Sequence, residues 1–303
     1  MRVAFFGTPE WAVPVLDALN RHHQVVLVVT QPDKPKGRGL KPAPSPVAQY
    51  ALAHGLPLLK PKRLRDPEFL EAFRKAAPEV AVTAAYGKIL PKEVLEVPPY
   101  GFLNLHPSLL PKYRGPAPVP WALIRGEKET GVAIMRTEEG VDTGPLYALW
   151  RTEIAPEEDA EALAKRLRDK GIELLLEVLQ DLPRLTPMPQ EGEPSYAPLL
   201  TKEEGRIRFE ESAQAIYNRH RGVQPWPGTY FFHRGKRVKV LAMRPEPGEG
   251  ESGVVQAVDR EGVLVGTGEG LIRLLQVQPE GKRPMPAADW ARGYGVVPGT
   301  RLG

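Results

Sequence analysis

The chain has 303 residues, of which 42% are hydrophobic and 26% charged, a balance typical of a soluble globular protein with room for two domains. It has no Cys, which excludes disulfides, a zinc ribbon and a thiol nucleophile, and its six His residues are not at metal-ligand spacing. No apolar run approaches the roughly 20 residues that cross a membrane, and MRVAFFG lacks a signal-peptide cleavage site, so we expect a cytoplasmic protein.

The first half of the chain alternates apolar runs with helical patterns. Buried strands are predicted at RVAFFGT, QVVLVVTQ, EVAVTAAYG, GFLNLH and TGVAIMRT, because each is a short run dominated by apolar residues. Helix starts are predicted where Pro follows Thr8, Ser45 and Asp66, since such residues cap helices whose first turn tolerates Pro. Strands separated by helices favour a doubly wound, mostly parallel (Rossmann-like) α/β sheet, in which ligands bind beyond the carboxyl ends of the strands.

A long amphipathic helix from about Glu157 to Leu182 closes this unit, so a first domain is predicted at residues 1–182. Five Pro residues in PRLTPMPQEGEPSYAPLL then indicate an extended, semi-rigid linker at 183–205. Residues 206–303 hold one short helix, AQAIYNRHRG, followed by short strands separated by Gly-rich turns such as DREG and GTGEG. This pattern predicts a small OB-like β-barrel domain.

Positive charge is concentrated in the last third of the chain. Arg206 to Gly303 contains 15 Lys and Arg against 10 Asp and Glu, a net charge of +5, whereas the remainder has 26 against 27. Taken alone, this favours a polyanionic partner only modestly, because a basic surface is often simply solvated.

Polar side chains gather at the end of one predicted strand and in a later loop. Asn104 and His106 in FLNLH alternate onto one face of the strand, and Asp142 follows in EEGVDTGPLY. An amide and a cationic imidazole can stabilise an oxyanion, while a carboxylate orients the imidazole and helps to take a proton from an attacking amine. Without a Cys or a G-x-S-x-G elbow, this trio favours acyl transfer with no covalent enzyme intermediate. The alternative is that these residues only satisfy backbone groups at a strand end.

A nicotinamide enzyme is disfavoured, because the first turn, GTPEW, lacks the G-x-G-x-x-G fingerprint that cradles a pyrophosphate. Fragments in order along the chain instead resemble the methionyl-tRNA formyltransferase family, within the superfamily that uses 10-formyltetrahydrofolate. These fragments are TQPDKPKGRG, AAYGKILPKEVL, LNLHPSLLPKYRGPAPVPWALIRGEKETGVAIM, EEGVDTGPLY, QPWPG and PGTRL. Six fragments in the right order over the whole chain make the resemblance specific.

The resemblance implies roles for the matching positions. Asn104, His106 and Asp142 match the catalytic trio of the superfamily. The formyl donor would be 10-formyltetrahydrofolate, and no metal is implied. The positions implied to form the folate site are Ser108, Leu109, Leu110 and Pro111, then Tyr86, Gly87, Lys88, Ile89 and Leu90, and then Glu138, Gly140 and Val141.

Two basic regions match the parts of the family that bind tRNA. The loop after the second strand carries Lys34, Lys36, Arg38 and Lys41, and Arg38 in GRG matches the functional arginine of the family's insertion loop. The alternative for this loop is a mobile, solvated connector. In the barrel domain, the resemblance implies tRNA contacts from Arg219, Arg221, Arg234, Lys236, Arg237 and Lys239. Trp226 in QPWPG lies in the same domain, and we interpret it as a core residue.

The resemblance therefore implies formylation of methionyl initiator tRNA, with that tRNA as the partner and no membrane or protein partner. Pro107 departs from this pattern, because members that formylate glycinamide ribonucleotide have Pro there, whereas members acting on tRNA often have a small residue. A small-molecule formyltransferase or a formyltetrahydrofolate hydrolase is consequently the alternative. A third hypothesis is an RNA-binding protein whose first domain has lost activity, and the intact trio argues against it.

Overall fold

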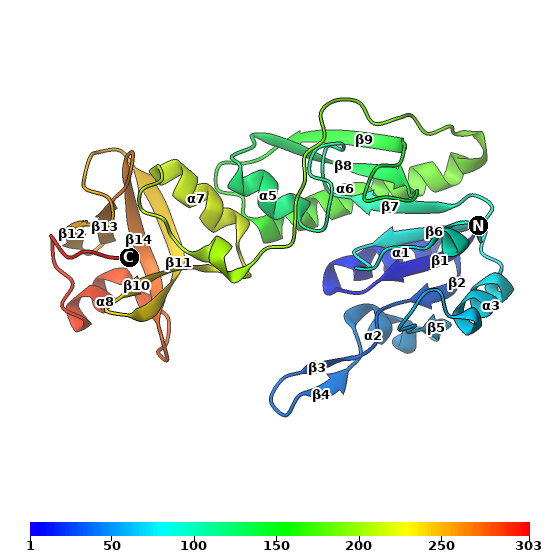
Figure 1. The fold of residues 1–303 in the computed structure, drawn as a ribbon, viewed down its shortest axis with the longest axis horizontal. Helices are drawn as coiled ribbons and strands as arrows, with labels where there is room; N and C mark the ends of the chain where they lie inside the picture. Colours follow the sequence, from blue (N-terminus) through cyan, green and yellow to red (C-terminus); the bar gives the residue numbers. More distant parts are fainter. The chain divides into compact units, whose positions relative to one another are not determined.

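The computed structural model describes residues 1–303 and divides them into two compact units (Figure 1). The first unit consists of Met1–Pro118, Glu129–Glu153 and Ala164–Pro198. The second consists of Val119–Lys128, Ile154–Leu163 and Leu199–Gly303. Because the second unit includes two internal segments, a single cut does not separate the units, and the domain boundaries at 182 and 206 remain predictions.

The first unit is built on a seven-stranded sheet with the order β5-β2-β1-β6-β7-β8-β9. Five neighbouring strands run parallel, as the apolar runs predict, whereas β8 is antiparallel to β7 and β9 is antiparallel to β8. The mostly parallel α/β sheet is therefore confirmed, with two antiparallel strands added at one edge. The strands are β1 (Arg2–Gly7), β2 (Gln24–Val29), β5 (Leu58–Leu59), β6 (Val80–Ala84), β7 (Phe102–His106), β8 (Glu129–Arg136) and β9 (Leu146–Glu153).

Four predicted helices of the first two thirds of the chain begin close to their predicted starts, whereas α4 (Lys92–Leu95) and α5 (Pro118–Ile124) were not predicted. The other helices are η1 (Glu10–Ala12), α1 (Val13–His22), α2 (Pro46–Ala53), α3 (Pro67–Ala76) and α6 (Ala160–Asp181). Ser45 caps α2 as predicted, because its hydroxyl oxygen accepts the Ala48 amide at 3.1 Å. Asp66 precedes α3 but accepts no capping bond, so only the position of that helix start is confirmed.

Helices cover both faces of the sheet. On one face Phe6 of β1 packs edge-on against Phe73 of α3 and Phe102 of β7, with ring centroids 5.5 and 5.1 Å apart. Val3 and Phe5 point to the opposite face, since side chains alternate along a strand, and both are fully buried. This two-sided burial explains why the central strands read as continuous apolar runs.

The order of the strands reverses between β1 and β6. From β1 the chain continues to β2 on one side, and it later returns to β6 on the other side. Loops that follow such neighbouring strands diverge and leave a crevice where α/β proteins bind ligands. Here the loops after β1 and β6 carry Thr8 and Tyr86, and the Thr8 hydroxyl donates to the Tyr86 carbonyl at 3.1 Å.

The Pro-rich segment is hydrogen-bonded along the first unit. After the short η2 (Leu182–Arg184), the amides of Met188 and Leu146 donate to each other's carbonyls at 2.9 and 2.7 Å. Farther along, the Ala197 amide donates to the Arg114 carbonyl at 2.7 Å. The segment then reaches η3 (Lys202–Gly205) in the second unit.

The second unit contains an antiparallel sheet with the order β10-β11-β14-β13-β12, and β15 pairs with β14. The helix α7 (Ala213–Gly222) has the predicted bounds, whereas α8 (Ala287–Gly293) was not predicted, and its Trp290 is fully buried. The strands are β10 (Thr229–His233), β11 (Lys236–Glu246), β12 (Val255–Asp259), β13 (Gly262–Gly266), β14 (Leu271–Pro279) and β15 (Met285–Pro286).

The C-terminal residues close this sheet into a barrel. Gly303 and Phe232 of β10 exchange backbone hydrogen bonds at 2.9 Å in both directions. At the other edge, the Val255 amide of β12 donates to the Thr300 carbonyl at 2.8 Å, and the Leu302 amide donates to Gly253 at 2.7 Å. Because these residues bond to both edges of the sheet, no long edge remains open, and the predicted β-barrel is confirmed.

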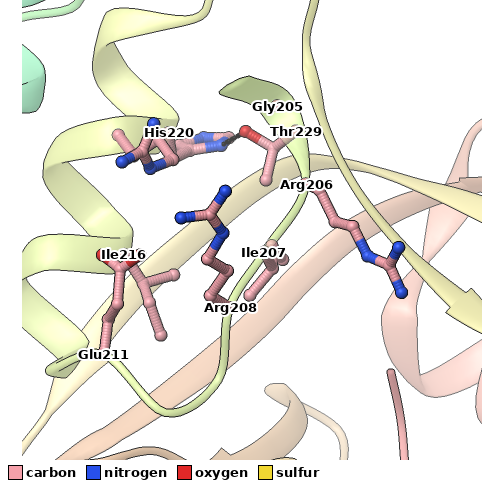
Figure 2. A pocket seen from close by; sticks show the side chains of 9 residues that line it. Gly205, Arg206, Ile207, Arg208, Glu211, Ile216, His220 and Thr229 are labelled. Carbon is pink, nitrogen blue, oxygen red and sulfur yellow. Dashed lines mark hydrogen bonds between the residues drawn. The ribbon is translucent and has the colours of Figure 1, made fainter. Parts of the chain in front are cut away.

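One buried histidine of the second unit is held as a neutral ring. His220 Nδ1 lies 2.7 Å from the Thr229 hydroxyl (Figure 2). It also lies 3.3 Å from Gln224 Nε2. Burial lowers the pKa of His220 to about 4, and the charge of Asp159 opposes this shift only in part. The Arg208 side chain points into the same small pocket (Figure 2).

We therefore expect the second unit to lose stability as the pH falls from about 6.5 through about 4, because the unfolded chain then binds a proton that the folded His220 rejects. The full effect is at most about 3 kcal/mol. Urea unfolding at pH 7 and pH 4.5 measures it, and His220→Gln should reduce the pH dependence. His22→Gln, at an exposed position of α1, is the control. An unchanged pH dependence in His220→Gln would contradict the assignment.

Candidate active site

The end of β7 presents the first two predicted site residues on one face. Phe102, Asn104 and His106 alternate with residues that point to the other face, and Asn104 is partly exposed whereas His106 is 5% exposed. His106 Nε2 lies 2.9 Å from the carbonyl oxygen of Tyr113, so this nitrogen carries a proton and donates it. The imidazole is thereby fixed by the loop that follows its own strand.

Asp142 reaches this ring from an unexpected direction. Since β8 is antiparallel to β7, the loop after β8 begins beside Phe102, where the Thr137 amide donates to the Phe102 carbonyl at 2.8 Å. The loop must therefore fold back along β7 to bring Asp142 Oδ2 to 3.7 Å from His106 Nδ1. The same carboxylate oxygen accepts the Gly115 amide at 2.8 Å. The structure thus brings His106 and Asp142 together, close to Asn104.

The His106 ring lies between a carbonyl oxygen and a carboxylate. Its Nε2 donates to the Tyr113 carbonyl, and its Nδ1 faces the Asp142 carboxylate. The 3.7 Å separation is longer than a hydrogen bond, which leaves Nδ1 free to bond a reacting group. A protonated Nδ1 beside an amide is suited to stabilising negative charge on an oxygen atom.

Three loops at this site each contain a residue other than Gly in the left-handed conformation. Ala85, Tyr113 and Asp142 have φ angles of 51°, 58° and 55°. Such conformations are unfavourable for residues with a Cβ and persist only where the surroundings enforce them. Their occurrence in all three predicted site loops supports assigning the site to this region.

The side chains of residues 108–111 point into the protein. Ser108 is fully buried, and its hydroxyl donates to the Lys112 carbonyl at 2.7 Å. Leu110 packs in a cluster with Ala133 and Met135, while Leu109 and Pro111 are also buried. A ligand lying along this segment would therefore contact mainly its backbone.

The loop after β6 is anchored by its Tyr86 residue. The ring is buried beside Phe6, and this burial raises the pKa of Tyr86 to about 12. The Tyr86 carbonyl accepts both the Thr8 hydroxyl and Gln31 Nε2, at 3.1 and 2.8 Å. Sequence reasoning missed Thr8 and Gln31, because a side chain that bonds a distant carbonyl leaves no periodic signal.

The remainder of that loop faces outward. Gly87 is exposed, Leu90 is partly buried and Ile89 is 82% exposed, although it is a large apolar residue. Lys88 Nζ donates to the carbonyls of Pro61 and Lys62 at 3.1 and 2.8 Å. Burial, and secondly the nearby Lys34 cation, lower the pKa of Lys88. Lys34 therefore lies close to this loop.

The loop between β8 and β9 is likewise exposed at Glu138, Gly140 and Val141. Val141 is 55% exposed, so this loop and the loop after β6 each present one apolar side chain next to accessible backbone. Exposed backbone donors and acceptors beside apolar side chains are suited to a flat heteroaromatic ligand with polar edges.

The basic loop after β2 forms a two-stranded hairpin. Strands β3 (Lys34–Lys36) and β4 (Lys41–Ala43) pair antiparallel, and Figure 1 shows them extending from the first unit. Lys34, Lys36, Arg38 and Lys41 are all exposed, and none of them forms a salt bridge. The hairpin therefore presents four cations to solvent.

The cations predicted on the second unit fall into two groups. Arg234, Lys236 and Lys239 are exposed on or beside the β10–β11 turn, and the Arg237 guanidinium lies 4.8 Å from the centre of the Tyr230 ring. These four are accessible to a polyanion.

Arg219 and Arg221 do not belong to the basic surface that was predicted for them. Arg221 is 6% exposed, because it donates to the carbonyls of Ala155 and Glu158, at 3.3 and 3.0 Å. Arg219 pairs with Glu204 at 2.7 Å. Both serve the packing of the second unit.

The interpretation of Trp226 as a core residue is wrong. It is 54% exposed, because it lies in a tight turn after α7, where the Gly228 amide donates to the Val223 carbonyl at 2.9 Å.

No group of three or more His, Asp or Glu side chains is arranged to hold a metal ion. No helix has the length and apolar character needed to span a bilayer.

Comparison with known proteins identifies the class to which this fold and site belong. Residues 1–179 match the formyl transferase family, and residues 199–295 match the formyl transferase C-terminal domain. The chain therefore belongs to the formyl transferase family.

Two relatives align with nearly the whole chain. The chain is 75% identical over 303 residues to the methionyl-tRNA formyltransferase of Thermus thermophilus, covering 100% of this chain and 99% of that protein. It is 49% identical to the methionyl-tRNA formyltransferase of Deinococcus radiodurans, covering 99% of this chain and 95% of that protein.

Solved structures share the fold at low identity. An N-formyltransferase from Helicobacter canadensis, solved with folinic acid and dTDP-3-aminofucose, aligns with a TM-score of 0.69 and 16% identity, covering 92% of this chain and 99% of that one. HypX from Aquifex aeolicus, solved with tetrahydrofolic acid, aligns with a TM-score of 0.65 and 20% identity, covering 96% of this chain and 47% of that one.

Proposed function

We propose that this chain transfers the formyl group of 10-formyltetrahydrofolate to the amino group of methionyl initiator tRNA, giving N-formylmethionyl-tRNA. The observation that carries the proposal is the 75% identity, over all 303 residues, to a relative named for this reaction. The arrangement of His106 and Asp142 beside Asn104 supplies the chemistry that such a reaction requires.

The exposed loops around the site fit a folate. Accessible backbone beside Ile89 and Val141 suits the flat, polar-edged pterin ring, and the exposed backbone of the loop after β6 could hold its edge. When bound, the cosubstrate supplies a formyl group on nitrogen. The positions proposed to contact it are Tyr86, Gly87, Lys88, Ile89 and Leu90, then Ser108, Leu109, Leu110 and Pro111, and then Glu138, Gly140 and Val141.

Asn104, His106 and Asp142 have different roles in the transfer. As the amine attacks the formyl carbon, the Asn104 amide and His106 Nδ1–H donate to the formyl oxygen, on which negative charge develops. Asp142 faces Nδ1 of His106 and orients the ring from that side, while the Tyr113 carbonyl holds the opposite edge of the ring. Asp142 is positioned to help take the proton that the amine loses as the new C–N bond forms. The C–N bond between the formyl carbon and the folate then breaks, and the departing folate nitrogen takes up a proton.

Cations on both units would contact the tRNA. The hairpin contributes Lys34, Lys36, Arg38 and Lys41, and the barrel contributes Arg234, Lys236 and Arg237. Contacts with phosphates supply affinity that falls with added salt, so charge reversal at the three barrel cations should weaken tRNA binding and reduce its salt dependence.

A direct assay tests the proposal. The purified protein is incubated with labelled 10-formyltetrahydrofolate and one of three acceptors: methionyl initiator tRNA, small amines, or water alone. Label recovered on the methionyl group supports the proposal. Label on a small amine, or release of formate without tRNA, would support the small-molecule enzyme or the hydrolase. Binding of tRNA without transfer would indicate an RNA-binding protein.

Arg38→Lys is expected to lower kcat/KM for formylation of initiator tRNA by about tenfold, because lysine keeps the charge but loses the planar fork of donors. The Kd for bulk tRNA should change by no more than about twofold. Steady-state formylation and filter binding measure the two effects. Arg65→Lys, at another exposed position of the first unit, serves as the control. Equal losses in both assays would indicate that the hairpin contributes only nonspecific electrostatic attraction to RNA.

A further inference from the structure

The Pro-rich segment lies directly behind two loops of the proposed active site. Met188 pairs with Leu146, at the end of the loop that carries Asp142. Ser195 Oγ accepts the amide of Tyr113 at 2.9 Å, and the Tyr113 carbonyl is the group that fixes His106. This segment therefore contacts the backbone that supports both members of the catalytic pair.

Gln190 lies in the middle of this segment, and both the nitrogen and the oxygen of its side-chain amide form hydrogen bonds. Its Nε2 donates to the backbone carbonyls of Asp142 and Gly144, each at 2.8 Å. Its Oε1 accepts from Nη2 and Nε of Arg114, at 3.0 and 3.3 Å. One partly buried amide thus ties the Asp142 loop to the loop that follows β7.

The partners of Gln190 determine which way its amide points. Arg114 has only donors and the two carbonyls are only acceptors, so a rotated amide would place donors against donors and acceptors against acceptors. Arg114 therefore orients Gln190, and Gln190 in turn holds two carbonyls that flank Thr143.

The Asp142 loop requires such support. Asp142 has a φ of 55°, which costs energy for a residue with a Cβ. At Gly144 a Cβ would overlap the Arg136 carbonyl oxygen, so the loop packs against the end of β8 with no room to adjust. Two hydrogen bonds from Gln190 stabilise this constrained backbone.

We propose that Gln190 is a positioning residue for the reaction, acting through the backbone of Asp142. By holding the carbonyls of Asp142 and Gly144 it keeps the Asp142 carboxylate facing His106 Nδ1, and Arg114 keeps Gln190 in the orientation that allows this. Gln190 itself does not touch the reacting atoms. The inference rests on the proposed function, because it concerns the orientation of the proposed catalytic pair.

Gln190→Glu separates positioning from simple attachment of the segment. Glutamate keeps the acceptor for Arg114, now as an ion pair, but loses both donors to the Asp142 loop. We expect kcat to fall by about tenfold or more, since a small misplacement of a catalytic group is costly, while KM for both substrates stays within about twofold. Gln190→Leu, which loses every bond, should show a similar fall in kcat.

If Gln190 only attaches the segment to the protein, Gln190→Glu should retain wild-type kcat, because the contact with Arg114 survives. Wild-type kcat in this variant would overturn the inference. Glu191→Gln, the exposed neighbouring position, is the matched control and should behave as wild type. Thermal unfolding of each variant checks that the fold is kept.

A readout independent of turnover keeps this inference separate from the proposed function. NMR of the His106 ring reports its contact with a carboxylate, and the ring signals should shift in Gln190→Glu but not in Glu191→Gln. An inactive wild type with this shift would reject the proposed reaction and leave the positioning role intact. An active wild type without the shift would reject the positioning role alone.

Discussion

Replacement of His106 or of Asn104 by Ala is expected to lower kcat for formyl transfer by about 10²- to 10³-fold. Each substitution removes one donor aimed at the oxygen on which charge develops, and the donor of His106 lies on a ring that is 5% exposed. Because both donors act mainly in the transition state, folate affinity should change little. Single-turnover assays at saturating substrates and a separate measurement of folate binding test this directly.

The two variants differ in their structural cost, which makes Asn104→Ala the cleaner test. His106→Ala also leaves the buried Tyr113 carbonyl without its donor, whereas Asn104 is only partly buried. Thermal unfolding should therefore accompany both assays. Turnover close to wild type in either variant would remove that residue from the mechanism, whatever its stability.

The fold was predictable where local patterns determine it. Continuous apolar runs at β1, β2 and β6 report burial on both faces, and the helix α7 was predicted with its observed bounds. The direction of β8 was not predictable, because an apolar run carries no information about the direction of the strand beside it. The strand β9 was not predicted, and its sequence LYALWRTE is not a continuous apolar run. The helix α8 was missed for a similar reason, since its seven residues are too few to establish a period.

The candidate site was less predictable from the sequence than the fold. The alternation in β7 places Asn104 and His106 on one face, but their proximity to Asp142 came from the family resemblance and not from spacing. The Asp142 loop begins beside Phe102 and folds back, a path that depends on the antiparallel register of β8. Gln190 was not predicted, because its partners are backbone carbonyls that the sequence does not distinguish.

Asp142→Asn is expected to lower kcat by on the order of a hundredfold while preserving the fold. The asparagine amide oxygen can still accept the Gly115 amide, now 2.8 Å from Asp142 Oδ2, so the loop keeps its anchor. What is lost is the negative charge 3.7 Å from His106 Nδ1, which faces the imidazole during the transfer. Asp142→Ala should in addition lower the thermal unfolding temperature, because the Gly115 donor loses its partner.

Combining Asp142→Asn with His106→Ala determines whether the carboxylate acts through the imidazole. If it does, the double variant should be no slower than His106→Ala alone, since the charge of Asp142 has no ring left to act on. If Asp142 contributes independently, for example by accepting the amine proton itself, the two losses should multiply. Asp181→Asn, an exposed position at the end of α6, is the control and should leave kcat unchanged. A loss of stability in Asp142→Asn with unchanged turnover per folded molecule would instead make Asp142 a structural residue of its loop.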